Sequence, residues 1–421
     1  MLGDRLRFLH HRLRAGRGRS LGPDLRGCGT ARRPRSGGLR GHLSRRTLFT
    51  PMKEKMMTRP AFALALALVA ATPALAEDSN LRAALSVLPD TAFSAIGAEV
   101  VRYVDLSALA SAYGGALDRE ALARVLLGGG IRPVEALAVG TPESFAKKSG
   151  IDSAELAFAA GMGQPPNAVS VWGFNQGEAA ATAFSSLTAH DFAERSSGMI
   201  ANGEPGVMNI AGRDPADPWR GPMGQASVVA LSGPTLLQAG DPAVLEPILA
   251  EGHSALDSPA GLIMLDALEA EEGTVLQAAF LGPWHGLGSG IDPAALAGKT
   301  PDEARAVLEQ AAAAAAGGLP FWQGAAVADL DTEKNPAMVL ALAYADCADA
   351  QVAADGAADL WREMDGTSED LADARVAQIQ PSGCAAILRV TGRDEKPRPF
   401  NQAIHALMSG NLPALRIGTG N

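Results

Sequence analysis

Short apolar runs recur along the chain from Glu99 onward, and turn-prone Gly, Pro, Asn and Asp residues separate them. The runs are four to ten residues long and include "EVVRYVDL", "NAVSVWGF", "TVLQAAFLG", "AMVLALAY" and "CAAILRV". This length and spacing predict β-strands. Several neighbouring runs are too close in sequence for a parallel crossover, so we expect antiparallel pairing. "ASVVALSGPTLLQAG" and "GAAVADLDTEKNPAMVLALAY" are typical of hairpins.

Helices are predicted between these runs by capping residues and alanine-rich segments. Thr300-Pro301-Asp302-Glu303 supplies a capping box, with proline at the first helical position, before "EARAVLEQAAAAAAGG". Asp241-Pro242 and Asp118 begin two further helices. Strands and helices in this arrangement predict an α+β fold, with two lobes of antiparallel sheet and helices packed on one face.

A weak internal duplication is visible in the same pattern. "NAVSVWGFNQGEAAATAFSSL" and "AMVLALAYADCADAQVAADGAADL" share an apolar strand, an aromatic residue near its end, a polar turn and an alanine-rich helix. A hairpin is expected after each, "GMIANGEPGVMNIAG" in one case and "ARVAQIQPSGCAAILRVTG" in the other. Duplication and convergent patterning both account for this. We expect a first lobe over residues 77–285 and a second over residues 286–421.

The N-terminal region has the features of an export signal. An apolar stretch from Ala61 to Ala71 follows Arg59 and precedes Thr72-Pro73-Ala74-Leu75-Ala76, which predicts a signal peptide over residues 52–76 with cleavage after Ala76. The stretch is shorter than the ~20 residues of a membrane span. Residues 1–51 hold thirteen arginines and no lysine, and we interpret them as a disordered, mis-assigned upstream leader. A transit peptide is the alternative, and Ser44-Arg45-Arg46-Thr47-Leu48-Phe49 resembles a twin-arginine signal.

Removing this leader makes the chain strongly acidic. Residues 1–76 contain 16 of the 36 basic and 3 of the 46 acidic side chains, which leaves 20 and 43 and a formal charge of −23. Such a surface repels phosphate backbones, so nucleic acid is excluded as a partner. We expect an acidic periplasmic protein with no stable membrane span after cleavage.

Two cysteines remain beyond the leader, Cys347 and Cys384. In an oxidising compartment an isolated pair predicts a disulfide rather than a metal or redox site. Cys347 follows one apolar strand and Cys384 opens another, so the bond would join two neighbouring strand ends.

The sequence contains none of the common catalytic motifs. There is no G-x-S-x-G, Walker A or G-x-G-x-x-G pattern, and the four histidines beyond the leader have no paired spacing. Asp329, Asp331, Glu333 and Asn335 alternate as in a calcium loop, but Lys334 and Leu340 stand where glycine and the bidentate Glu are required. We therefore predict no cofactor, no metal and no catalytic residues.

One part of the chain resembles a known family. "GIDSAELAFAAGMGQPPNAVSVWGFNQGEAAATAF" and "DPADPWRGPMGQASVVALSGPTLLQAGDPAVLEPIL" are similar to exported bacterial proteins and lipoproteins of unknown function, over roughly residues 150–281. The shared features are turn and cap positions, and the lipobox cysteine of some members is missing. The resemblance implies an exported α+β domain and no particular activity.

Three aromatic loops are the strongest functional signal in the sequence. They are "DPADPWRGPMG", "GPWHGLGSG" and "GLPFWQG", and their candidate binding residues are Trp219, Arg220, Trp284, His285, Phe321 and Trp322. The alternative is that each indole plugs the end of a lobe. We predict a non-catalytic module that binds an unknown envelope protein or small ligand through these loops. The other hypothesis is a hydrolase that pairs His253 or His285 with a carboxylate in a cleft.

Overall fold

The structure is a computed structural model of the chain. It describes residues 79–93, 100–196, 198–250, 252–287, 296, 298–315, 317–332, 335–364, 367, 370–393 and 398–418. The expected leader, the signal peptide and the mature N-terminus at Glu77 lie outside these residues. No helix in the described ranges is long and apolar enough to cross a membrane.

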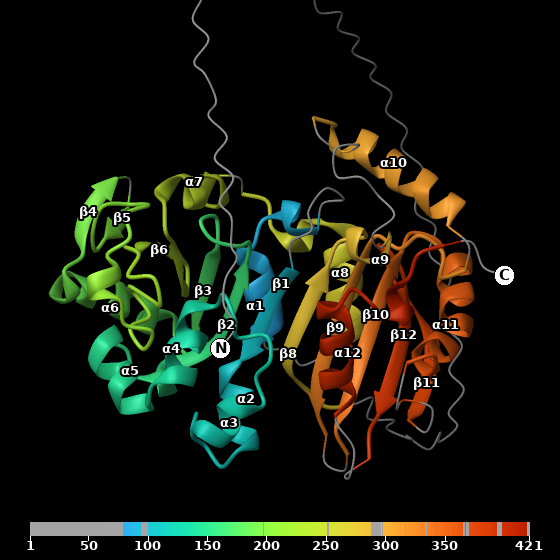
Figure 1. The fold of residues 1–421 in the computed structure, drawn as a ribbon, viewed down its shortest axis with the longest axis horizontal. Helices are drawn as coiled ribbons and strands as arrows, with labels where there is room; N and C mark the ends of the chain where they lie inside the picture. Colours follow the sequence, from blue (N-terminus) through green and yellow to red (C-terminus); the bar gives the residue numbers. More distant parts are fainter. Residues whose placement is uncertain are drawn as a thin grey trace, which may run out of the picture. The chain divides into compact units, whose positions relative to one another are not determined.

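Twelve strands of the described chain form one continuous sheet, in which every neighbouring pair is antiparallel (Figure 1). The order across the sheet is β11-β12-β10-β9-β8-β1-β2-β3-β7-β6-β5-β4. The strands are β1 (Val100–Asp105), β2 (Leu156–Met162), β3 (Val169–Phe174), β4 (Ala193–Ser196), β5 (Met199–Ala201), β6 (Val228–Ser232), β7 (Thr235–Ala239), β8 (Thr274–Leu281), β9 (Gly324–Asp331), β10 (Ala337–Tyr344), β11 (Leu371–Ile379) and β12 (Gly383–Thr391).

The two halves of the sheet follow the same path. β1–β2–β3 and β8–β9–β10 are three consecutive antiparallel strands, each followed by a helix and later by a hairpin. The second strand of that hairpin pairs with the third strand of its half, as β7 does with β3 and β12 with β10. β1 and β8 pair at the centre, from Val100 with Leu281 to Val104 with Gln277. This order matches the duplication expected from sequence.

The hairpin equivalence expected from sequence is wrong in one half. β11 and β12 form the expected second hairpin, but their counterpart is β6–β7, the "ASVVALSGPTLLQAG" segment. "GMIANGEPGVMNIAG" contains only the short β5 and an irregular loop. β4, β5 and that loop are an insertion in the first half. The insertion was not evident from sequence, because a polar stretch follows the alanine-rich helix in both halves.

Helices cover both faces of the sheet, so the expected α+β antiparallel class is confirmed but packing on a single face is not. One face carries α1 (Asn80–Val87), α7 (Pro242–Ala250) and α8 (Pro259–Glu269). The other carries α2 (Leu106–Ala112), α3 (Arg119–Ala123), α4 (Arg132–Val139), α5 (Pro142–Ser149), α6 (Gly177–Ser186), α11 (Cys347–Arg362) and α12 (Pro399–Met408). Two further helices, α9 (Trp284–Leu287) and α10 (Pro301–Ala314), flank the second half.

Small residues explain why the central strands accept cover on both sides. β10 is buried along its whole length, with alanine and valine on one face and Met, Leu and Tyr on the other. At Gly324 on β9, a Cβ atom would lie 3.2 Å from the Cβ of Ala260 on α8, so the helix packs closely on the strand. A strand buried on both faces shows a continuous apolar run instead of an alternation, and sequence alone does not reveal the second layer.

Several local predictions are confirmed. Thr300 and Glu303 form the capping box that begins α10, and both expected hairpins, β6–β7 and β9–β10, are present. Cys347 and Cys384 form a disulfide with a Cα–Cα distance of 5.1 Å. The bond joins the first turn of α11 to β12, and so it fastens a helix to the sheet.

Candidate functional site

Trp219 and Arg220 belong to the loop that the sequence singled out first, and the indole lies in the core. Trp219 is 2% exposed and stacks on Trp172 of β3, with ring centroids 4.5 Å apart. Its Nε1 donates to the carbonyl of Ser149 at 3.0 Å. Arg220 Nη2 donates to the carbonyl of Asn202 at 3.1 Å. Both side chains therefore hold the loop to the first half, because a buried indole needs a partner for its N–H.

Trp322 is also buried, and the candidate residues do not form one surface. Trp322 is 0% exposed and donates from Nε1 to the carbonyl of Leu415 at 3.1 Å. Trp284 and Phe321 are half-buried against Leu296 and Leu308 near α10. His285 lies on α9 and lines a hollow whose described lining contains no carboxylate. Trp219 and Trp322 thus pack in separate cores, and Trp284, His285 and Phe321 remain together beside the second core.

The structure also shows where the candidate catalytic and metal-binding side chains lie. His190 packs against Gly150, His253 is exposed beside Asp257, and His405 is on α12, so these histidines lie on separate elements. No group of three or more His, Cys, Asp or Glu side chains in the described residues is arranged to hold a metal ion. Asp329, taken from the calcium-like pattern, instead accepts a bidentate pair of hydrogen bonds from Arg124.

The first aromatic loop does border an open surface feature, through its prolines. We call this feature the apolar groove. It has a volume of about 350 Å³ and lies between α3, α4 and the 214–224 loop. Its apolar lining is Leu122, Val125, Leu126, Val134, Ala138, Val139, Pro215 and Pro222. No motif in the sequence identified this set, although "VLL" before Gly128-Gly129-Gly130 places apolar side chains just after a helix.

Exposed apolar side chains gather at the groove. In the described chain eleven large apolar side chains are exposed; two of them line the groove, and four lie on the loop segments next to it. Leu126 and Val139 are 43% and 64% exposed inside the groove. The other four, which we call the apolar rim, are Val207, Met208, Ile210 and Met223. The Asn209 N–H donates to the carbonyl of Gly224 at 2.9 Å, which places Met208 and Ile210 beside Met223 and Pro222.

A buried polar network fixes the wall of the groove. Gln277 on β8 accepts hydrogen bonds from the N–H groups of Leu126 and Leu127 at 2.9 and 3.3 Å. Its Nε2 donates to the carbonyl of Arg124 at 2.9 Å and to Asp329 at 3.1 Å. Arg124 donates to both carboxylate oxygens of Asp329, at 2.9 and 3.0 Å. The segment after α3 is therefore bonded to β8 and β9 of the other half.

The electrostatics of the network agree with its geometry. Burial alone would lower the pKa of Arg124, but the hydrogen bonds and the charge of Asp329 more than offset this and raise the pKa.

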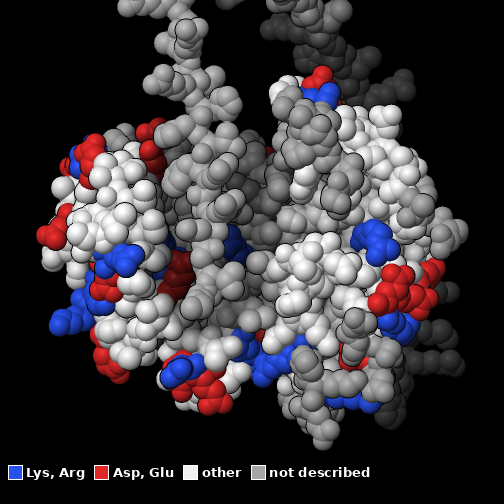
Figure 2. Space-filling view, in the orientation of Figure 1, with Lys and Arg blue, Asp and Glu red and all other residues white. Residues whose placement is uncertain are grey.

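On the molecular surface, basic side chains lie in small groups among acidic ones on the face shown in Figure 2. The described residues on that face do not form the broad basic field that a nucleic-acid-binding protein needs.

Comparison with known proteins adds little. No protein-family model matches the chain, and no curated protein matches it. A solved structure described as crystal form I of TP0453 matches with a TM-score of 0.28 and 9% sequence identity, covering 76% of this chain and 96% of that one. A likeness at this level carries no inference about function.

Proposed function

We propose that the protein is an exported, non-catalytic periplasmic module that binds an apolar segment of another envelope protein in the apolar groove. Two exposed apolar side chains inside the groove, with four more on the adjoining loop segments, support this proposal most directly. Exposed apolar side chains scattered singly are normal, whereas a contiguous set marks an interaction site. The segment's apolar side chains would fill the groove and extend over the rim.

The size of the surface favours a protein over a small ligand. The groove is open, and its apolar character continues beyond it onto the rim through Pro222 and Met223. A small molecule that fills the groove would leave the rim uncovered. A protein segment covers both parts at once, and the fixed wall around Leu126 reduces the cost of ordering the groove on binding.

The test is site-specific photocrosslinking in the host's envelope. A photoreactive amino acid replaces Val139 in the groove, and the matched control replaces Leu249 on α7, which is 40% exposed on the opposite face. We expect a discrete protein adduct only from position 139. Leu126→Asp should reduce its yield about tenfold or more, because burying one leucine contributes roughly 1.5–3 kcal/mol.

Two results would argue against this function. Equal adducts from positions 139 and 249 would show that the groove is not selective. An adduct insensitive to Leu126→Asp would place the contact outside the groove. Intact mass of the exported protein tests localisation separately, because cleavage after Ala76 predicts a chain that starts at Glu77.

A further inference from the structure

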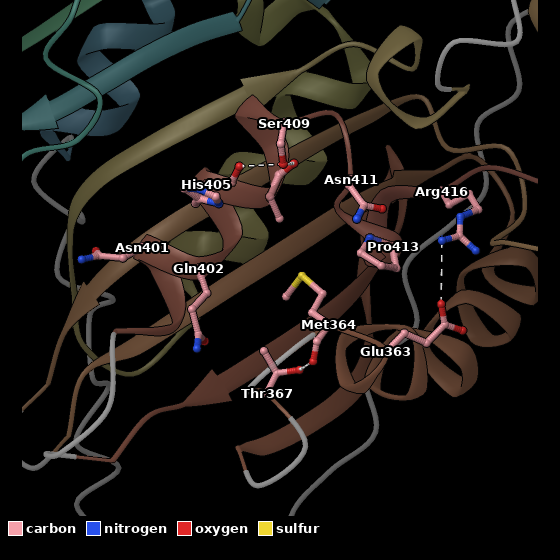
Figure 3. A pocket seen from close by; sticks show the side chains of 11 residues that line it. Glu363, Met364, Thr367, Asn401, Gln402, His405, Ser409, Asn411, Pro413 and Arg416 are labelled. Carbon is pink, nitrogen blue, oxygen red and sulfur yellow. Dashed lines mark hydrogen bonds and ion pairs between the residues drawn. The ribbon is translucent and has the colours of Figure 1, made fainter.

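A second hollow lies in the other half of the molecule, and its lining is polar. It has a volume of about 650 Å³ and is bordered by the end of α11, one side of α12 and the C-terminal residues (Figure 3). Its polar lining includes Glu363, Asn401, Gln402, His405, Asn411 and Arg416. We call it the polar cavity. Figure 3 shows that Gln402 extends from α12 toward Met364 and Thr367, while Arg416 and Glu363 stand at the opposite side.

Four polar side chains that line this cavity are not hydrogen-bonded to the rest of the described chain. The side chains of Asn401, Gln402, His405 and Asn411 make no hydrogen bond to another described residue, and the Gln402 Oε1 atom is buried. A buried oxygen without a donor is costly, so the Gln402 amide would gain by turning toward a ligand N–H group in the cavity. His405 and Asn411 are exposed, so their hydrogen-bonding groups are open to solvent or to a ligand.

Another hollow of similar size shows the contrast. It lies between α1, β1 and β8, and its polar groups bond one another. Asp105 accepts hydrogen bonds from Tyr103 Oη at 2.9 Å and Asn80 Nδ2 at 3.1 Å, while Arg82 donates to Asp266 at 2.8 Å. That network stabilises the junction of the two halves and leaves little capacity for a ligand. The polar cavity has the opposite character.

The polar cavity also presents one positive and one negative group side by side. Arg416 Nη2 and Glu363 Oε2 are 3.7 Å apart, and their side chains are 45% and 53% exposed. An ion pair of this length and exposure contributes little to stability. It can exchange its partner for the charges of a ligand, because the guanidinium is a good receptor for a carboxylate and the carboxylate for an ammonium group.

The frame around the cavity is firmly held. Trp322 Nε1 bonds the carbonyl of Leu415, and the Ile417 N–H donates to the carbonyl of Gly286 at 2.7 Å, so the C-terminal residues are anchored on both sides of Arg416. Thr367 is fully buried and donates to the carbonyl of Trp361 at 2.7 Å, which fixes the end of α11. A cavity that is formed in advance binds a ligand at lower entropic cost.

We propose that the polar cavity binds a small zwitterion, a free α-amino acid or a short peptide. Its carboxylate contacts Arg416 with Asn411 beside it, and its ammonium group contacts Glu363. A peptide N–H group donates to Gln402 Oε1 after that amide turns toward the cavity, and the aliphatic part lies on Met364, Ala406 and Pro413. This site is separate from the apolar groove, so either proposal can fail without the other.

Calorimetric titration of the mature protein with alanyl-alanine tests the proposal at low ionic strength. We expect saturable one-to-one binding, and Arg416→Gln and Glu363→Gln should each weaken it about tenfold. The matched control is Arg305→Gln, which breaks an exposed ion pair with Glu309 on α10 and should leave the affinity unchanged. Asn411→Asp is a second test, because it adds a negative charge on an exposed side chain beside Arg416 and should also weaken binding of the carboxylate.

Three results would overturn the proposal. The first is the absence of saturable heat with alanyl-alanine. The second is equal affinity for N-acetyl-alaninamide, which lacks both charges, or displacement of the dipeptide by acetate alone at equal concentration. The third is an equal loss in Arg305→Gln. Circular dichroism of each variant before titration separates lost binding from lost folding.

Discussion

Replacing Arg124 by methionine should destabilise the protein strongly, although Arg124 lies in an irregular segment after a short helix. The side chain is 7% exposed and pairs with Asp329, whose side chain is 2% exposed. Without the guanidinium, Asp329 keeps only the Gln277 Nε2 donor at 3.1 Å among its side-chain partners. The carboxylate would then be buried with its charge largely uncompensated.

The magnitude follows from burial. Breaking a buried pair by removing one partner costs about 3–5 kcal/mol, because the remaining charge has lost both water and its counterion. Arg124 also contacts Asp331, at 3.1 Å, but that carboxylate is 42% exposed. Asp331→Asn should therefore cost only about 0–1 kcal/mol. Replacing both buried partners, as Arg124→Met with Asp329→Leu, should recover most of the loss, since no buried charge remains.

Urea unfolding followed by circular dichroism measures all four proteins. The reasoning is refuted if Arg124→Met unfolds within about 1 kcal/mol of the parent, or if the double variant is less stable than the single one. Arg124→Met should also lower the crosslinking yield at Val139, because the wall of the apolar groove loses its anchor. Asp331→Asn should leave that yield unchanged.

Three further predictions concern the cores, the disulfide and pH. Trp219→Ala should cost about 3–5 kcal/mol in urea unfolding, as for a large aromatic residue removed from a core, whereas a solvent-facing binding residue would cost little. Cys347→Ser with Cys384→Ser should cost about 4 kcal/mol from the loop entropy of 37 residues, measured by unfolding without reductant. Burial, with the charge of Asp105, raises the pKa of Tyr103 well above its ordinary value, and burial also raises that of Tyr344. The unfolded phenols ionise at pH ~10, while the folded phenols stay protonated. The contribution of the protonated phenols to the free energy of unfolding is therefore fully present below pH ~10 and falls as the pH rises further. Tyr103→Phe should make the fall between pH 9 and 11 shallower in urea titrations, and an unchanged slope would contradict the assignment.

Local signals in the sequence predicted the elements well, because caps and turns act over a few residues. Thr300 with Glu303, and the turn at Ser232-Gly233-Pro234, determine their structures through neighbouring backbone groups. The second helical layer was not predictable in this way. Whether a run such as β10 is covered on one face or two depends on segments far away in sequence.

The sequence identified the loop that borders the candidate site, but not which of its side chains face that site. The 214–224 loop does border the apolar groove, but Trp219 turns into the core and Pro215 and Pro222 face the groove. Composition indicates that a loop is rich in aromatic residues and proline, yet the direction of each side chain depends on its packing partners. For Trp219 those are Trp172 and Phe192, on a strand and a segment that precede the loop. The polar cavity has no signal in sequence, since its residues come from three separate segments.

The pairing of β1 with β8 also matters during synthesis. Val100 meets Leu281, so one edge of β1 stays open while the whole intervening first half is being made. An unpaired strand edge is a template for association with other chains. Contacts this distant in sequence also form slowly. That edge of β1 therefore has no partner strand until β8 has been made, which is a long interval in which association with other chains is possible.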